Sequence, residues 1–372
     1  MAGAITPLVM PKWGLEMRQG RITAWLVGEG SEVRVGQPLV EIETDKISNT
    51  YEAGDAGVLR RILAREDDTL PVKALLGVLA PPEVSDAEID AFIASYVVPA
   101  AEEEERRGGP AFEFATVDGI RVRYARRGDA AAGATPVLFL HGYGGDLNNW
   151  LFNLDAAAAR AQVIALDLPG HGESDVRLPG ASIDALATFV LRFLDALGVE
   201  RVHAVGHSMG GAIAAQMALT APARIASLAL VNSAGLGEEI DAGYIEGFAR
   251  APSRRELKPL LERLFADPAL VTRQLVDDLL KYKRLDGVEA LLTELGTALF
   301  GGGRQTERPA LRLAGTAPPM LVIWGRDDRI IPAAHAAQAP AGAKVHVLAG
   351  AGHMTMMEKA NEVNALLRGH WE

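Results

Sequence analysis

Thr44-Asp45-Lys46-Ile47-Ser48 is the segment from which the fold of the first part of this chain is inferred, because it joins the two halves of an internal repeat. Each half alternates apolar and polar residues in short runs separated by turn residues, which is typical of half-buried β-strands. Two such halves that face each other would bury their apolar positions in a small sandwich and hold Lys46 out in the turn at its tip. The matching positions lie 37 residues apart: Gly20 and Gly57, Ile22 and Leu59, Leu26 and Leu63, Val33 and Leu70, Val35 and Val72, Leu39 and Leu76, and Ile42 and Leu79.

An exposed lysine is most often a solvated surface residue, but the sequence around Lys46 favours a second interpretation. The stretches ITPLVMP (residues 5–11) and EIETDK (residues 41–46) resemble the lipoyl/biotinyl carrier family, and in particular the lipoyl domains of 2-oxoacid dehydrogenase complexes. Biotinyl domains carry methionine on both sides of their lysine, whereas Asp45 and Ile47 stand here, which favours lipoate over biotin. The resemblance implies an all-β sandwich with lipoate in amide linkage to Lys46, where it carries an acyl group between active sites.

Composition limits the remaining functions. The chain has 372 residues, 49% of them hydrophobic, which suits two or three domains with full cores. It has no cysteine, so neither a disulfide nor a thiol nucleophile contributes, and the histidine spacing gives no metal site. The net charge of −11 argues against nucleic acid or an anionic membrane as a partner. No signal region and no apolar run approaching about 18 residues is present, which predicts a soluble cytoplasmic protein.

A change in composition separates a carrier domain at 1–81 from a linker at 82–111 and a second domain at 112–372. SDAE at 85–88 is a capping box and predicts the start of a short helix. This helix either packs back on its own chain or docks a partner subunit, and we favour the first interpretation. The run EEEERRGGP at 102–110 is charged and rich in glycine, and predicts a flexible hinge.

The second domain alternates apolar strands with helices, which predicts a mostly parallel sheet covered by helices on both faces. VDGI at 117–120 predicts a β-hairpin, and a helix is expected near residues 182–197. Helical patterns at about 235–315 interrupt the alternation and predict an inserted cap. Buried strands are expected near 136–140 and 162–167, a further strand near 202–206, and apolar strands near 227–231, 320–324 and 344–348.

The sequence GHSMG at 206–210 matches G-x-S-x-G, in which glycines permit the strained turn that presents a nucleophilic serine. It follows a predicted strand and opens a predicted helix. The alternative is that Ser208 only caps an ordinary strand-to-helix turn.

A serine hydroxyl is nucleophilic only beside a base that is itself oriented by an acid. His353 lies in a glycine-bounded loop directly after the last predicted strand, and is our candidate base. His141 and His171 belong to loop motifs, and we expect them to hold those loops in shape. WGRDDRIIP at 324–332 offers two candidate acids.

From about residue 112 to the C-terminus the chain resembles the α/β-hydrolase superfamily, in which the serine, acid and histidine occur in this order. The resemblance implies that Asp328, rather than Asp327, is the acid. It also implies an oxyanion hole formed by the backbone amides of Tyr143, in the HGYGG stretch at 141–145, and of Met209.

The fusion of the two domains resembles the family of dihydrolipoyl acetyltransferase (E2) subunits of acetoin dehydrogenase complexes over nearly the whole chain. The usual acyltransferase core of 2-oxoacid dehydrogenase complexes carries a His-x-x-x-Asp-Gly signature, which RGHWE at 368–372 lacks. Acetyl transfer from lipoyl-Lys46 to coenzyme A would therefore run through the serine triad. The resemblance implies two partner subunits, a thiamine-diphosphate-dependent E1 and dihydrolipoamide dehydrogenase.

Two alternatives stay open. The second domain is either a thioesterase or ester hydrolase tethered by its lipoyl domain, or a non-catalytic scaffold that docks other subunits. No phosphate-cradling motif identifies a coenzyme A site, and a homo-oligomer is also left open.

Overall fold

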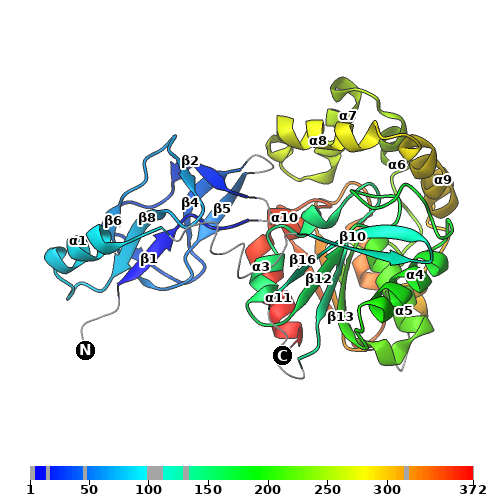
Figure 1. The fold of residues 1–372 in the computed structure, drawn as a ribbon, viewed down its shortest axis with the longest axis horizontal. Helices are drawn as coiled ribbons and strands as arrows, with labels where there is room; N and C mark the ends of the chain where they lie inside the picture. The colour runs from blue at the N-terminus through cyan, green and yellow to red at the C-terminus, as the bar shows by residue number, and fades with distance from the viewer. Residues whose placement is uncertain are drawn as a thin grey trace. The chain divides into compact units, whose positions relative to one another are not determined.

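The chain forms two compact units, Met1–Gly109 and Pro110–Glu372. They are seen in a computed structural model (Figure 1) that describes residues 5–13, 17–44, 48–98, 112–128, 134–313 and 318–371. Lys46 and the charged run at 102–110 lie outside the described residues. The predicted fold class is confirmed: an all-β sandwich precedes a mostly parallel α/β sheet with a helical cap.

The first unit contains eight strands and one helix within its described residues, and the strands form two four-stranded sheets. The sheet orders are β1-β8-β6-β3 and β5-β4-β2-β7. The internal repeat explains this symmetry, because β2, β3 and β4 recur 37 residues later as β6, β7 and β8. The elements are β1 (Thr6–Val9), β2 (Gln19–Trp25), β3 (Glu32–Val33), β4 (Pro38–Glu43), β5 (Ser48–Glu52), β6 (Gly57–Ile62), β7 (Thr69–Pro71), β8 (Leu75–Ala80) and α1 (Asp86–Ser95).

Most repeat positions inside the strands are buried, with Gly57 and Leu70 half-buried, but several just beyond strand ends are exposed. Ile22 and Leu59, equivalent in the repeat, are both fully buried. Leu26 and Leu63 are 47% and 37% exposed, and Val35 is 68% exposed. The expectation that every repeat position is buried was wrong here, because these residues follow β2 and β6 or lie in a turn, where the strand alternation no longer applies.

Helix α1 packs on the sandwich of its own unit. Ser85 and Glu88 form the predicted capping box at its N-terminus. Ile89 is fully buried against Val78 of β8, and Arg60 of β6 forms an ion pair with Asp86. The helix therefore packs back on its own chain, as we favoured.

The second unit is built on an eight-stranded sheet in the order β16-β15-β14-β13-β11-β12-β10-β9. The strands from β11 to β16 pair in parallel, and β10 pairs antiparallel with both β12 and β9. The strands are β9 (Glu113–Val117), β10 (Ile120–Arg127), β11 (Val137–Leu140), β12 (Val163–Leu166), β13 (Val202–His207), β14 (Ile225–Val231), β15 (Met320–Gly325) and β16 (Lys344–Leu348).

Helices cover both faces of this sheet, with α4 and α5 on one face and α3 and α11 on the other (Figure 1). Four further helices, α6 to α9, are inserted between β14 and β15 and form a cap above the sheet (Figure 1). The helices are α3 (Leu154–Ala158), α4 (Ile183–Ala196), α5 (Met209–Thr220), α6 (Ala242–Arg250), α7 (Arg254–Leu261), α8 (Arg273–Lys283), α9 (Val288–Phe300), α10 (Thr355–Glu358) and α11 (Ala360–Trp371).

The short 3₁₀ turns complete the second unit. They are η1 (Leu147–Trp150), η2 (Pro222–Arg224), η3 (Glu262–Leu264), η4 (Pro268–Leu270), η5 (Gly301–Gly303), η6 (Pro309–Arg312) and η7 (Ala333–Gln338). The loops at the carboxyl ends of the parallel strands gather at one edge of the sheet, where ligands bind in folds of this kind.

Candidate active site

Ser208 occupies a strained turn between β13 and α5. Its backbone has φ 52° and ψ −120°, a conformation that costs a non-glycine residue about 1–3 kcal/mol. The turn is held from the neighbouring strand, because Ser208 N–H donates to Val231 O at 3.1 Å and Ala234 N–H donates to Ser208 O at 3.0 Å. A Cβ atom at Gly206 or Gly210 would collide with backbone oxygens, so glycines are required on both sides of the serine. The strand-to-helix context expected for GHSMG is therefore present.

Asp328 follows β15, and its side chain is completely buried. Its Oδ1 atom accepts from the amides of Ile330 at 2.8 Å and Ile331 at 3.0 Å. Its Oδ2 atom accepts from His353 Nδ1 at 2.9 Å. Asp327 is exposed, and its carboxylate accepts from Gly350 N–H at 3.1 Å instead. Of the two candidate acids, Asp328 is the one in contact with the histidine.

His353 lies in the loop after β16 and is 3% exposed. Because a carboxylate only accepts, Nδ1 of His353 carries the proton and Nε2 is left as the acceptor. Nε2 of His207 donates to His353 O at 2.9 Å, and the two rings are 4.7 Å apart. His207 directly precedes Ser208, so this bond brings the histidine loop to the serine turn. Among the described residues, Ser208 and His353 share no direct hydrogen bond, which is common for catalytic pairs without substrate.

Asn232 is a site residue that the sequence analysis missed. Its Nδ2 atom donates to Asp328 Oδ2 at 2.7 Å and to Gly352 O at 3.1 Å, so one side chain holds both the acid and the histidine loop. Asn232 follows β14 with φ 44°, a left-handed conformation that asparagine tolerates better than most residues. The one sign of its role in the sequence was a polar residue directly after a predicted apolar strand.

The HGYGG loop packs directly against the serine turn. A Cβ atom at Gly142 would lie 2.9 Å from Ser208 Cβ, so glycine is needed for this approach. Tyr143 is held from above by the cap, since its hydroxyl donates to Leu292 O of α9 at 2.8 Å and its ring contacts Phe248 of α6. In the described part of the chain, the amides of Tyr143 and Met209 donate to no protein acceptor. Both are thus available to bind an oxyanion.

His141 and His171 support the loops around the site, as expected. His141 Nε2 accepts from Leu168 N–H at 2.9 Å, and His171 Nδ1 donates to Pro169 O at 3.0 Å. Burial lowers the pKa of His141 to about 4 and that of His171 to about 3, so both are neutral at physiological pH.

Charged side chains lie at the end of β4 in the first unit, which we call the carrier unit, and this end precedes Lys46 in the sequence. Glu43, the last residue of β4, pairs with Ser48, the first residue of β5. Arg21 of β2 forms ion pairs with Glu43 and with Asp67, the latter at 2.8 Å. The two described residues that lie nearest to Lys46 in these strands are therefore paired strand ends beside charged side chains.

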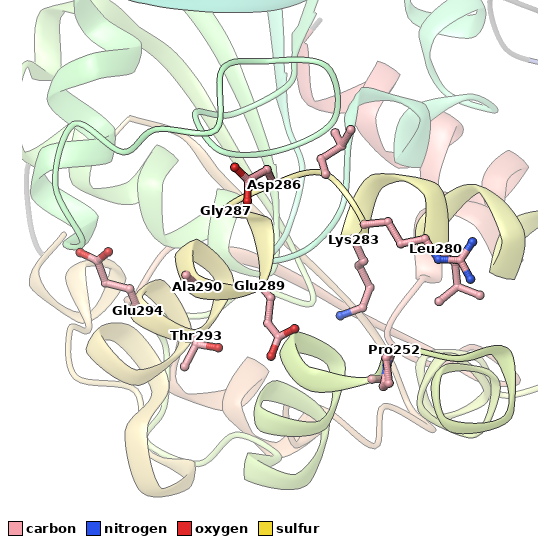
Figure 2. A pocket seen from close by; sticks show the side chains of 12 residues that line it. Pro252, Leu280, Lys283, Asp286, Gly287, Glu289, Ala290, Thr293 and Glu294 are labelled. Atoms are coloured by element: carbon pink, nitrogen blue, oxygen red, sulfur yellow. The ribbon is translucent and has the colours of Figure 1, made fainter.

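The cap contains a cavity of about 900 Å³ between α8, α9 and the α6–α7 connection. Figure 2 shows Lys283 of α8 and Glu289 of α9 pointing toward the same part of this cavity. Lys283 Nζ donates to Ala249 O at 2.8 Å and to Phe248 O, and burial lowers its pKa to about 8. Two basic residues and three acidic ones line the cavity, so it is not the cationic pocket that phosphate groups require.

Within the described ranges, no group of three or more histidine, aspartate or glutamate side chains is arranged to hold a metal ion. The helices of the same residues are all too short or too polar to cross a bilayer.

Comparison with known proteins identifies both units. A family model described as alpha/beta hydrolase fold matches residues 135–360, and one described as Biotin-requiring enzyme matches residues 6–79. The dihydrolipoyllysine-residue acetyltransferase component of the acetoin cleaving system of Cupriavidus necator is 60% identical, over 98% of this chain and 97% of that protein. The chain belongs to this acetyltransferase family. The resemblance inferred from the sequence is confirmed at the family level.

Two further comparisons concern the second unit of this acetyltransferase. A 2-hydroxy-6-oxononadienedioate/2-hydroxy-6-oxononatrienedioate hydrolase from Paraburkholderia phymatum is 33% identical over 67% of this chain and 90% of that protein. The solved structure of a meta-cleavage product hydrolase from Pseudomonas fluorescens has a TM-score of 0.62 and is 24% identical, covering 72% of this chain and 98% of that one. This structural similarity defines the fold of the acetyltransferase's second unit.

Proposed function

We propose that this chain transfers an acetyl group from a lipoyl arm on Lys46 to coenzyme A, through covalent catalysis by Ser208. The observation that carries the proposal is the contact between His353 Nδ1 and Asp328 Oδ2 at 2.9 Å, beside a serine held in a strained turn. This is the arrangement in which an acid fixes the tautomer and orientation of a base that activates a serine. The carrier unit in the same chain supplies the reason for transfer rather than simple hydrolysis.

The lipoyl group, when attached, supplies a dithiol that carries the acetyl group as a thioester. The residues of the carrier unit suit such an attachment, because Glu43 and Ser48 are paired strand ends that leave a four-residue connection containing Lys46. Arg21 and Asp67 keep this end of the sandwich charged and solvated.

In the first half of the reaction, Ser208 Oγ gives its proton to His353 Nε2 and attacks the carbonyl carbon of the acetyl thioester. The amides of Tyr143 and Met209 bind the oxyanion, an effect worth about 3 kcal/mol for each donor. Asp328 stabilises the imidazolium. The carbon–sulfur bond then breaks, and the departing thiolate takes the proton from His353, which leaves acetyl-Ser208.

The second half reverses these steps. His353 Nε2 takes the proton of the coenzyme A thiol, the thiolate attacks acetyl-Ser208, and the serine recovers its proton from the imidazolium. Water is the competing nucleophile for the same acyl-enzyme. Ser208 and His353 are only 5% and 3% exposed beneath the cap, which favours transfer because it limits access of water.

A single assay tests this proposal. The protein is given acetyl-dihydrolipoamide and coenzyme A, and both acetyl-coenzyme A and free acetate are measured. We expect thioester to exceed acetate, and Ser208→Ala to abolish both while the protein stays folded. Rapid acid quenching followed by peptide mass spectrometry is expected to find an acetyl group on Ser208. Undiminished acetyl-coenzyme A formation by Ser208→Ala would contradict catalysis by Ser208, and no formation by the unaltered protein would leave the scaffold alternative.

The hydrolase alternative has one observation in its favour, the similarity of the second unit to a hydrolase from Paraburkholderia phymatum. It predicts that acetate is the main product at every coenzyme A concentration. Transfer predicts that acetate formation falls as coenzyme A rises, because the two nucleophiles compete for one acyl-enzyme.

We further propose a thiamine-diphosphate-dependent E1 and dihydrolipoamide dehydrogenase as partner subunits in the cytoplasm, the first to load the lipoyl arm and the second to reoxidise it. Co-purification of the tagged chain from cells grown on acetoin tests this assembly. Recovery of the chain without either enzyme activity would contradict it.

A further inference from the structure

Outside the triad, the carboxylate of Glu358 in α10 joins the histidine loop to the cap. Its Oε2 atom accepts from Gly352 N–H at 2.6 Å, directly before His353. Its Oε1 atom accepts from Ala266 N–H at 2.8 Å and from Asp267 N–H at 3.4 Å. Ala266 and Asp267 belong to the cap, in the connection between η3 and η4. One side chain therefore binds backbone amides from two elements about 90 residues apart in sequence.

The two sides of the histidine loop are held by different parts of the unit. The carbonyls are held by core residues, since Gly352 O accepts from Asn232 and His353 O accepts from His207. Of two amides of the loop, one binds the cap directly and the other binds Glu358, which itself binds the cap. Gly352 N–H donates to Glu358, and Met354 N–H donates to Leu264 O at 3.1 Å. If the cap lifts, Met354 N–H loses its acceptor, and Glu358, the acceptor of Gly352 N–H, loses the two cap amides that donate to it.

The packing at this junction is as close as the backbone allows. A Cβ atom on Gly352 would lie 2.7 Å from Ala266 N and 2.8 Å from Leu264 O, so only glycine lets the cap segment approach the loop. Burial raises the pKa of Glu358, while the amides of Gly352, Ala266 and Asp267 lower it. The carboxylate is thus partly desolvated and relies on these amides.

We propose that Glu358 is a positioning residue that couples docking of the cap to alignment of His353, so that the base is in place only when the cap covers Ser208. The inference rests on the proposed function, because it assigns His353 the role of base. Its consequence is protection of the acyl-enzyme: while the cap is open and water has access, the histidine that would activate water is out of position. A transferase that must avoid hydrolysis gains from such coupling.

The test uses the full chain with Glu358→Gln, which keeps the shape of the side chain but replaces one acceptor oxygen with a donor. Glu362→Gln is the matched control, because Glu362 lies exposed on α11, four residues further along the chain. Two readouts are needed. The first is the rate at which phenylmethylsulfonyl fluoride modifies Ser208, which depends on the triad and requires no acetyl donor. The second is amide hydrogen exchange of residues 264–267 and 350–354.

We expect Glu358→Gln to slow modification of Ser208 about tenfold, the effect of losing one hydrogen bond to a charged group. Exchange should accelerate in both segments together. Gly352→Ala is a second variant, which separates the cap from the loop sterically and leaves Glu358 intact. It should produce the same joint change, and Glu362→Gln should produce none.

Three outcomes overturn the inference. Faster exchange at 264–267 with unchanged modification of Ser208 means that Glu358 holds the cap without aligning the base. Unchanged exchange and modification in both variants means that the junction has no such role. Failure of phenylmethylsulfonyl fluoride to modify Ser208 in the unaltered protein contradicts both the proposed triad and this inference. If the reagent modifies Ser208 but no acetyl group is transferred, only the proposed function fails. The inference about Glu358 is then still tested by the joint change in Ser208 modification and amide exchange.

Discussion

At the scale of single residues, the acid of this site is defined by its hydrogen bonds more than by its charge. Asp328 accepts from the amides of Ile330 and Ile331, from Asn232 and from His353. Four donors fill the four lone-pair positions of a carboxylate, so the side chain has no freedom to turn away from His353. Asp327 is exposed and, among the residues that the structure describes, accepts from Gly350 alone.

We therefore predict opposite results for two neighbouring substitutions. Asp328→Asn should lower the rate of acetyl transfer about a thousandfold or more, because an amide nitrogen facing His353 imposes the wrong tautomer. Asp327→Asn should change the rate less than about twofold, as is usual for exposed positions. Both variants are compared with the unaltered protein in the acetyl-transfer assay, and circular dichroism checks that each is folded. A large loss for Asp327→Asn with a small one for Asp328→Asn would place the acid one residue earlier.

At the scale of elements, hydrophobic periodicity predicted the strands β11 to β15 to within about two residues, because parallel strands buried on both faces leave uninterrupted apolar runs. Strand β16 was predicted as well, although it lies at the edge of the sheet and is partly exposed. The motif around Ser208 and the order of the candidate triad residues were also readable. Asn232 and Glu358 were not, because their contacts join segments about 90 or more residues apart and neither lies in a motif. Leu26 was predicted to be buried but is 47% exposed, since the repeat does not reveal where a strand ends.

The contact between the HGYGG loop and helix α9 leads to a second prediction. Tyr143→Phe removes the hydroxyl that donates to Leu292 O at 2.8 Å and keeps the ring that packs on Phe248. We expect a loss of about 1 kcal/mol in the free energy of unfolding and a larger acetate share among the products. The rate of Ser208 acetylation should change little, because the amide rather than the side chain is proposed to bind the oxyanion. Tyr143→Ala, which also removes the ring, should be worse in both measurements, and an unchanged free energy of unfolding and product ratio in Tyr143→Phe would contradict the role of the hydroxyl.

The loops held by His141 and His171 predict how stability depends on pH. Burial lowers the pKa of His141 to about 4 and that of His171 to about 3, whereas an unfolded histidine takes up its proton near pH 6.5. The unfolded chain thus binds protons first as pH falls, so this stability is present above about pH 6.5 and decreases below it, by about 1.4 kcal/mol per pH unit for each histidine. Burial raises the pKa of Asp167 to about 6, which offsets part of the loss between about pH 6 and pH 4.

Urea unfolding of the protein at about pH 7.5 and about pH 5.5 checks this sign. We expect a lower midpoint at the more acidic pH. His171→Asn should lower the midpoint at both values but show a smaller fall between them, because one buried neutral histidine is gone. A midpoint that rises on acidification would contradict the prediction.

At the scale of the whole molecule, two units with separate cores carry two separable chemical tasks. Residues of the carrier core, such as Ile22 and Leu39, belong to a hydrophobic cluster formed within the first unit. Every contact of Ser208, Asp328 and His353 described above lies within the second unit. Damage to one function should therefore leave the other intact.

Two reciprocal variants test this independence. In the presence of lipoate and its ligase, the unaltered chain should gain the mass of one lipoyl amide at Lys46, and Lys46→Arg should gain none, because a guanidinium keeps the charge but is not acylated by this route. Lys46→Arg should still transfer acetyl groups from free acetyl-dihydrolipoamide to coenzyme A at an undiminished rate, since its triad is untouched. Ser208→Ala should show the reverse pattern, with full lipoylation and no transfer. A lipoyl group on Lys73, biotin in place of lipoate, or loss of both activities in either variant would contradict the division of tasks between the two units.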